Sequence, residues 1–162
     1  STINVGDIPT KIVRDAQNNV WVLCAGQSDY SNYPIINKLS PSKLVRINTT
    51  TNTVDRSFTL INAGSPSYVV QLAIGNNGRT LYYSVSDRIY ALDITSGSLP
   101  ITALISGRNF YGLAASPFSN QIWALQAPNF TSSGYVFRYA SSGSLIDSLK
   151  VGIGPNGAVF NQ

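Results

Sequence analysis

The sequence predicts an all-β protein built from repeated four-stranded units, and three observations support this prediction. The first is composition, because the 162 residues include no Glu and no Met, and only 11% are charged. Helices favour Glu, Lys, Leu and Met, whereas strands and turns favour Val, Ile, Tyr, Thr, Gly and Asn. The second is an internal repeat, and the third is a regular alternation of short apolar runs with turn-forming clusters.

The internal repeat is clearest at the two ends of the chain. Residues 2–9, TINVGDIP, match residues 148–155, SLKVGIGP. Two intermediate copies can be placed between them, one starting before Ser65 and one at Gly107. The chain then contains three periods of about 49 residues each, a spacing that is typical of repeat architectures.

Two further landmarks recur once in each period. An apolar–aromatic pair follows a polar turn at 20–21, 81–82 and 122–123, and an alternating run ends in a tight turn at 44–48, 89–93 and 136–140. We therefore expect four short strands, A to D, in every period. The expected strands are 11–16, 20–24, 43–48 and 53–60 in the first period, 68–74, 80–85, 88–94 and 99–105 in the second, and 111–115, 121–125, 135–139 and 145–151 in the third.

Four-stranded units at this spacing are typical of a β-propeller, in which each unit is one blade. The opening VGDIP at 5–9, the strand NVWV at 19–22 and the segment LVRIN followed by TV at 44–54 resemble the YVTN/NHL-like (YncE-like) repeat propeller family. The resemblance covers essentially the whole chain, and it implies blades without implying a function. A β-sandwich of similar strand number is the alternative fold, but it would not explain the match between the two ends.

We expect a partial β-propeller over residues 1–162, a single segment with blades at about 9–62, 66–105 and 108–151 and a lone inner strand at 156–160. Propellers usually have four to eight blades, so three blades do not close a ring. The sequence therefore suggests the C-terminal part of a larger propeller. The expected partner is either the missing N-terminal blades of the same protein or a second copy of this chain around a two-fold axis.

The loops that join strand B to C, and strand D to the next A, meet at one rim of a propeller, where function usually lies. The first of these loops, 25–42, is unusually long and rich in Tyr and Asn, and ordinary surface insertion is its alternative interpretation. The rim suits a sugar or a peptide, because it combines polar and aromatic side chains. The candidate ligand-binding residues are Asp29, Tyr30, Tyr33, Arg108, Asn109, Tyr111, Asn129 and Phe130.

Several classes of chemistry are disfavoured by the residues present. The chain has no His, which removes a Ser/His/Asp triad and His-based metal sites, and its seven Asp residues are scattered singly. We therefore predict no catalytic residue, no metal site and no cofactor. The 11 basic residues never form a run, so nucleic-acid binding is not expected. No apolar stretch reaches the length of a membrane span, and Cys24 is expected to be a buried thiol.

The function that best fits these features is a non-catalytic binding or interaction module of an exported bacterial protein. A periplasmic or cell-surface location agrees with the low charge, the lack of disulfides and the abundance of Ser, Thr and Asn. One alternative is a propeller enzyme of the sugar-lactonase or lyase kind, whose site is completed by missing blades. Another is a purely structural or assembly role.

Overall fold

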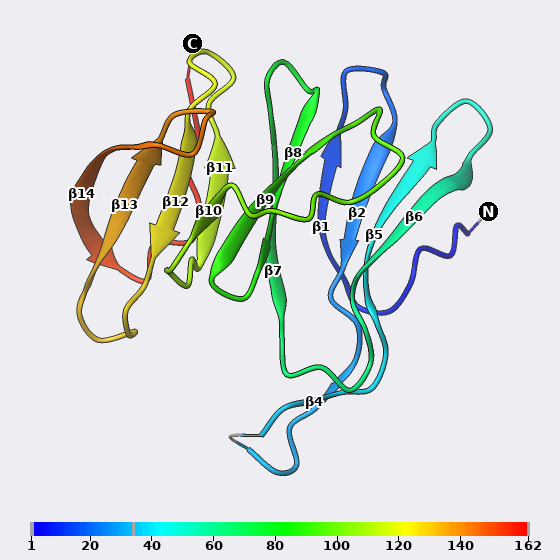
Figure 1. Ribbon diagram of the computed structural model, residues 1–162, viewed down its shortest axis with the longest axis horizontal. Helices are drawn as coiled ribbons and strands as arrows, with labels where there is room; N and C mark the ends of the chain where they lie inside the picture. Colours follow the sequence, from blue (N-terminus) through cyan, green and yellow to red (C-terminus); the bar gives the residue numbers. More distant parts are fainter. Residues whose placement is uncertain (1, 34, 162) are drawn as a thin grey trace. The chain divides into compact units, whose positions relative to one another are not determined.

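The computed structural model describes residues 2–33 and 35–161, and every regular element in these residues is a β-strand (Figure 1). The all-β class predicted from composition is therefore confirmed. The chain divides into two compact units, Ser1–Val70 and Gln71–Gln162. Each unit is described by itself.

The first unit contains one four-stranded antiparallel sheet. Its strands, in spatial order, are β1 (Pro9–Arg14), β2 (Val20–Cys24), β5 (Ser42–Asn48) and β6 (Thr53–Ile61). A two-stranded sheet of β3 (Ser28–Asp29) and β4 (Asn37–Lys38) lies in the connection between β2 and β5. The order of the four main strands is the A-to-D order expected for a blade.

The second unit contains two further four-stranded sheets, although β7 starts at the end of the first unit. One sheet consists of β7 (Val69–Gly75), β8 (Thr80–Val85), β9 (Arg88–Asp93) and β10 (Ile105–Ser106). The other consists of β11 (Gly112–Ala115), β12 (Ile122–Gln126), β13 (Ser133–Tyr139) and β14 (Leu145–Ile153). In both sheets the spatial order follows the chain.

Two predicted strands are wrong, because most of the first segment and all of the second make no ladder with a neighbouring strand. The strand expected at 99–105 shrinks to β10, which pairs with β9 only at Ile105 and Ser106. Pro100 has no N–H to donate to a ladder. The lone strand expected at 156–160 does not form either, and none of the described strands pairs with it. This segment is held by packing, since the ring of Phe160 lies edge-on to Trp123 with centroids 5.3 Å apart.

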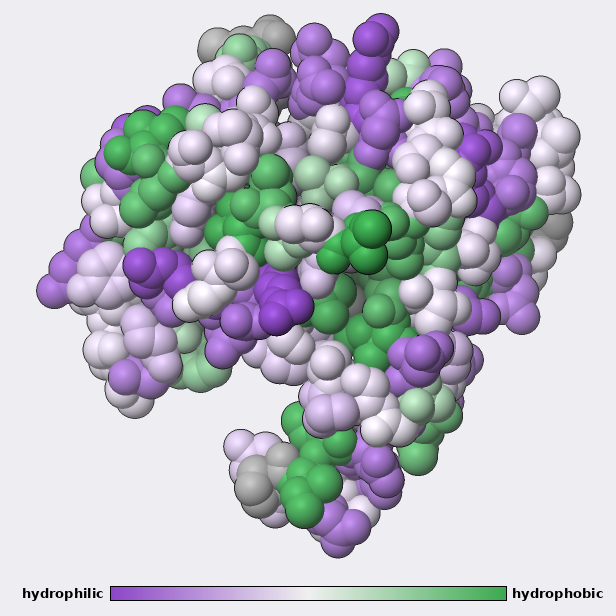
Figure 2. Space-filling view, viewed as in Figure 1, coloured by the Kyte–Doolittle hydropathy of each residue, from purple (hydrophilic) through white to green (hydrophobic). Residues whose placement is uncertain are grey.

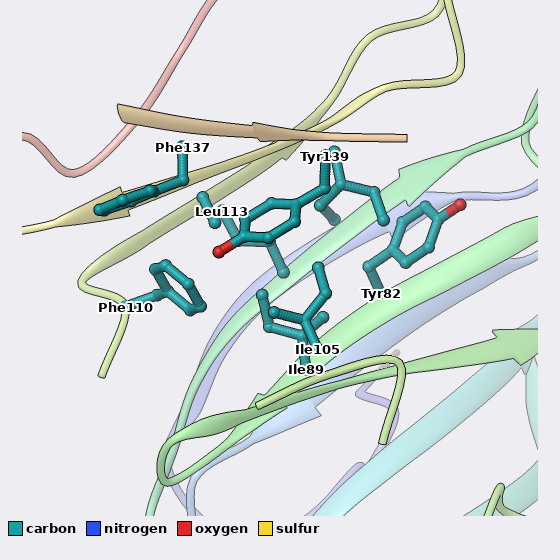
Figure 3. Packing of buried hydrophobic residues seen from close by; sticks show 10 residues of the cluster. Tyr82, Ile89, Ile105, Phe110, Leu113, Phe137 and Tyr139 are labelled. Atoms are coloured by element: carbon teal, nitrogen blue, oxygen red, sulfur yellow. The ribbon is translucent and has the colours of Figure 1, made fainter. Parts of the chain in front are cut away.

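The core of the second unit joins its two sheets through apolar side chains (Figure 3). Phe110 packs edge-on against Phe137 and Tyr139, with ring centroids 6.1 and 6.2 Å apart. A Cβ added at Gly75 would lie 2.9 Å from the Cβ of Ala115, so a residue without a side chain is needed there. The cluster consists of Ala73, Tyr82, Ile89, Ile105, Phe110, Leu113, Ile122, Ala124, Phe137 and Tyr139.

A Trp–Arg–Asp row crosses the sheet of the first unit. Trp21 on β2 lies opposite Arg46 on β5, whose guanidinium carbon is 5.8 Å from the centre of the indole ring. The same guanidinium donates two hydrogen bonds of 2.8 Å to the carboxylate of Asp55 on β6. These bonds hold the pKa of Asp55 below its usual range. The row therefore ties strands B, C and D together.

The last sheet repeats this row with Trp123, Arg138 and Asp147. The Arg138 guanidinium carbon lies 5.6 Å from the Trp123 ring centre, and both of its donors bind the Asp147 carboxylate. The middle sheet has Tyr82 opposite Ala91 instead and lacks the row. The first and last blades thus share a Trp–Arg–Asp row, which the apolar pattern of the sequence does not reveal.

The two tryptophans differ in the partner of the indole nitrogen. Trp21 Nε1 donates to the buried carboxylate of Asp15 at 2.9 Å. The other oxygen of Asp15 accepts from the backbone N–H groups of Gln17 and Asn19, both at 2.9 Å. One carboxylate therefore closes the turn and satisfies the indole.

Ser116 takes the place of Asp15 in the last sheet. Its N–H donates to Gln121 across the turn at 2.9 Å, as that of Asp15 does to Asn19. Its single hydroxyl oxygen accepts from the N–H groups of Phe118 and Ser119. Within the described residues, the buried Trp123 Nε1 has no hydrogen-bond partner.

The substitution Ser116→Asp should supply that missing acceptor. We expect the free energy of unfolding to rise by about 0.5–1.5 kcal/mol, the net value of one additional hydrogen bond. Urea denaturation followed by circular dichroism measures the change. In a Trp123→Phe background the same substitution should give no gain, because no indole donor is present. An equal gain in both backgrounds would contradict the assignment.

Candidate functional site

The connection between β2 and β5 is an insertion that extends past the end of the sheet of the first unit (Figure 1). It carries large side chains that are more than half exposed, among them Tyr33, Ile35 and Leu39. Figure 2 shows hydrophobic residues gathered on this insertion, at the lower end of the view. Exposed apolar and aromatic groups on an ordered loop are typical of a contact surface.

A cavity of about 390 Å³, which we name the insertion cavity, lies at the base of this insertion. Its wall is held by backbone hydrogen bonds. The N–H of Ala25 donates to Ile8 at 2.8 Å, and the N–H of Leu39 donates to Gln27 at 2.9 Å. The lining residues are Ile8, Ala25, Gly26, Gln27, Ser28, Tyr30, Lys38, Leu39 and Tyr68.

The backbone around the insertion cavity is unusual at two positions. Gly26 has a φ of +74°, and a Cβ there would lie 2.5 Å from the carbonyl oxygen of Ser40, so only glycine fits. Ile8 has a φ of 52°, a conformation in which a β-branched side chain is a genuine outlier. Strained backbone tends to occur at functional sites, because the surrounding structure must hold it in place.

Lys38 is the most distinctive lining residue, because its side chain is almost completely buried, with 6% of its surface exposed. Its Nζ donates to the carbonyl oxygen of Ala25, another lining residue, at 2.7 Å. Burial lowers the pKa of this ammonium group from its usual value. Among the ion pairs of the described residues, none involves Lys38. The cavity wall therefore holds a cation without a carboxylate partner.

The three sequence-predicted residues of this insertion have different roles. Tyr30 lines the insertion cavity, as expected for a ligand-contacting residue. Asp29 is occupied by its own turn, since its carboxylate accepts from the N–H and the hydroxyl of Ser31 at 2.9 and 3.0 Å. These bonds lower the pKa of Asp29. Tyr33 is exposed and is not among the lining residues.

The predicted residues of the second unit form aromatic contacts. The guanidinium carbon of Arg108 lies 4.4 Å from the ring centre of Phe137, a cation–π geometry. Tyr111 and Phe130 meet edge-on, with centroids 5.1 Å apart. Asn109 follows Arg108 directly and precedes the buried Phe110.

Asn129 stabilises its own turn. Its Oδ1 accepts from the N–H and hydroxyl groups of both Thr131 and Ser132, at distances between 2.7 and 3.0 Å. A second cavity of about 490 Å³ lies beside this turn, and none of the predicted residues lines it. Its lining residues are Pro128, Thr131, Ser132, Ser133, Tyr135, Lys150 and Ile153.

Sequence reasoning missed Ile8, Lys38 and Tyr68 as cavity residues. Lys38 stands in a loop near Ile36 and Leu39, and a lysine in a loop is expected to be solvated because of its charge. Ile8 and Tyr68 lie outside the insertion and reach the cavity only through the fold. Tyr30 was found because it lies in the insertion itself.

Other features of the described residues bear on chemistry. Cys24 is a buried thiol, as predicted, and burial raises its pKa. In the part of the chain that the structure describes, no cluster of three or more His, Cys, Asp or Glu side chains could hold a metal ion. No helix long and apolar enough to cross a membrane occurs in residues 2–33 and 35–161.

Comparisons with solved structures identify the fold as a β-propeller. The chain aligns with the β-propeller domain of Cps50 (Swd1) from Myceliophteria thermophila at 15% identity and a TM-score of 0.54, covering 86% of this chain and 38% of that one. It aligns with the β-propeller domain of the Trilobed protease from Pyrococcus furiosus, which has an open velcro topology, at 10% identity and a TM-score of 0.57, covering 90% and 43%. Hydrazine synthase from Kuenenia stuttgartiensis aligns at 18% identity and a TM-score of 0.58, covering 91% and 43%.

These similarities establish the fold and leave the family open. The chain spans about two fifths of the length of these three structures. No protein-family model and no curated protein matches the sequence. The resemblance to the YncE-like family therefore stays a prediction, whereas the propeller fold that it implied is confirmed.

Because Lys38 is buried without a carboxylate partner among the described residues, we expect its replacement to change the stability of the fold. At pH 7 we expect the free energy of unfolding of the Lys38→Met variant to exceed that of the unaltered chain by about 1–2 kcal/mol, because the substitution removes a buried charge. The carbonyl of Ala25 keeps the hydroxyl of Ser42 as a donor. Because folding lowers the pKa of Lys38, the unfolded chain binds more protons than the folded chain. The free energy of unfolding of the unaltered chain should therefore rise relative to that of the variant as the pH rises toward about 10.5.

Urea titrations of both proteins at pH 7 and pH 9.5 measure this difference. The matched control is Lys150→Met, which replaces an exposed lysine of the second cavity and should change stability by less than about 0.5 kcal/mol. A Lys38→Met variant that is less stable than the unaltered chain at pH 7 would contradict the view that this cation lacks a partner.

Proposed function

We propose that this protein is a non-catalytic β-propeller binding module and that the insertion cavity is its ligand site. The proposal rests on the length of the insertion, which exceeds what the connection between strands B and C requires, and on its ordered structure. The equivalent connection between β8 and β9 needs only Ser86 and Asp87, whereas β2 and β5 are joined by residues 25–41. Long ordered loops in compact domains are usually functional.

A short peptide with an apolar or aromatic side chain is the ligand that the cavity wall supports best. Ile8 and Leu39 expose about half of their surface or more, and they offer aliphatic contact. Tyr30 and Tyr68 add aromatic area, which binds peptides at low entropic cost. Sugar hydroxyl groups would gain little from the aliphatic residues.

The proposal that the module is non-catalytic rests on the sequence. A chain with no His and no Glu lacks the commonest general bases. We also propose export from the cell, which the low charge and the abundance of Ser, Thr and Asn support.

Binding can be tested by a ¹⁵N–¹H correlation titration with the neutral peptide acetyl-Leu-Phe-amide. We expect dose-dependent shifts of the amide signals of Gly26, Ser28 and Leu39, which line the insertion cavity. Methyl glucoside, a neutral sugar, should leave these signals in place.

A pair of matched variants sharpens this test. Tyr30→Ala should weaken the peptide response, because it removes an aromatic wall. Phe130→Ala should not, although Phe130 is as exposed as Tyr30 and lies in the second unit. Shifts caused by the glucoside alone, or peptide shifts confined to other residues, would overturn the proposed site.

We propose further that additional blades complete the ring, either from the same protein or from a second copy of this chain. The coverage of about two fifths of each aligned structure supports this proposal, since propellers of four to eight blades are the rule. Three blades on their own would present unpaired strand edges and apolar faces to water.

The isolated chain should therefore self-associate. Size-exclusion chromatography with light scattering should give a mass at least twice the 17.4 kDa of one chain. Dilution should shift the distribution toward the monomer. A well-dispersed monomer that stays stable at high concentration would argue against both forms of ring completion.

A further inference from the structure

We infer that the insertion cavity binds its ligand through a carboxylate group, which pairs with the ammonium group of Lys38. This inference rests on the proposed function, because it assigns a charge to the ligand of the same cavity. It adds a chemical class that the apolar and aromatic wall alone does not specify. Its basis is the state of Lys38 and the use of the donors around it.

The first step is the unmet demand of the buried cation. Lys38 is 6% exposed, and the acceptor found for its Nζ among the described residues is the carbonyl of Ala25 at 2.7 Å. An ammonium group carries three donors. Buried charges in proteins are normally paired, because an isolated ion loses its hydration without compensation. In Lys38 that compensation is incomplete within the described residues.

The second step is that acidic groups of the chain do not supply the partner. Asp29 stands one position from the register partner of Lys38 in the two-stranded sheet. Its two carboxylate oxygens are occupied by Ser31. Desolvation is the cause of the lowered pKa of Lys38, and no neighbouring carboxylate opposes it. An anion from outside the chain would therefore relieve the penalty.

The third step concerns the other donors of the cavity wall. The backbone N–H groups of Ala25, Gly26, Gln27 and Leu39 all donate within the chain. Lys38 is the only basic residue among the lining residues. The other side-chain donors of the wall, such as the Gln27 amide and the Ser28 and Tyr30 hydroxyls, are neutral. Lys38 would therefore supply the positive charge for a bound anion, which suits a singly charged carboxylate held by a charge-assisted hydrogen bond.

The fourth step concerns the group beside the carboxylate. Ile8 and Leu39 line the same cavity as Lys38 and contribute aliphatic surface to its wall. The ligand should therefore carry an apolar group next to its carboxylate. A peptide offers this combination at its C-terminal residue, or at an Asp or Glu side chain beside an apolar residue.

The test compares three blocked dipeptides on the unaltered chain at pH 7. Acetyl-Leu-Phe has a free terminal carboxylate, acetyl-Leu-Phe-amide is neutral, and acetyl-Asp-Phe-amide has a side-chain carboxylate. Dissociation constants come from the shifts of the Gly26, Ser28 and Leu39 amide signals. We expect at least one carboxylate peptide to bind about tenfold or more tightly than the neutral one. The better of the two identifies the source of the carboxylate.

Variants link this preference to Lys38. In Lys38→Met the carboxylate and neutral peptides should bind equally, whereas Lys150→Met should keep the full preference. The comparison of peptides on the unaltered chain needs no variant, so the inference is testable even if Lys38→Met does not fold. Equal binding of all three peptides to the unaltered chain would overturn the inference and leave the proposed function intact. Absence of binding by every peptide would overturn both.

Discussion

The second strand of each sheet is the element on which the rest of this structure depends, because it is buried on both faces. Trp21, Leu23 and Cys24 on β2 have no exposed surface, and Leu81 on β8 and Ile122 on β12 are equally inaccessible. A strand covered on both faces needs a continuous apolar run and a hydrogen-bonded neighbour on either side. Strands A and C supply these neighbours, and strand D lies on the other side of strand C.

The polar groups of the blades are arranged around this buried strand. The indole of Trp21 can be buried because Asp15 accepts its N–H, and Arg46 covers its ring while holding Asp55 on the next strand. The last blade keeps Arg138 and Asp147 but has Ser116 at the turn. The repeat therefore tolerates the loss of one acceptor, because ladder hydrogen bonds and core packing carry most of the stability.

A scaffold of this kind allows one connection to grow without loss of the fold. The insertion between β2 and β5 starts and ends on buried strands, so the core fixes its two ends. The two-stranded sheet of β3 and β4, the glycine at position 26 and the strained Ile8 then define a cavity beside the blade. Burial of the Lys38 ammonium group in this cavity wall carries a desolvation penalty, and such a penalty is consistent with a site that selects its ligand by charge.

The sequence by itself determined the buried strands, because their signal is local. The ranges 20–24 and 80–85 were predicted with their observed bounds, since each is a continuous apolar or aromatic run that follows a turn. The tertiary structure decided the fate of 99–105 and 156–160, because a segment becomes a strand only where its backbone runs alongside a neighbouring strand and hydrogen-bonds to it. It also decided the site: Tyr30 was recognisable from its loop, whereas the burial of Lys38 and the approach of Ile8 and Tyr68 arise from contacts between segments that are distant in sequence.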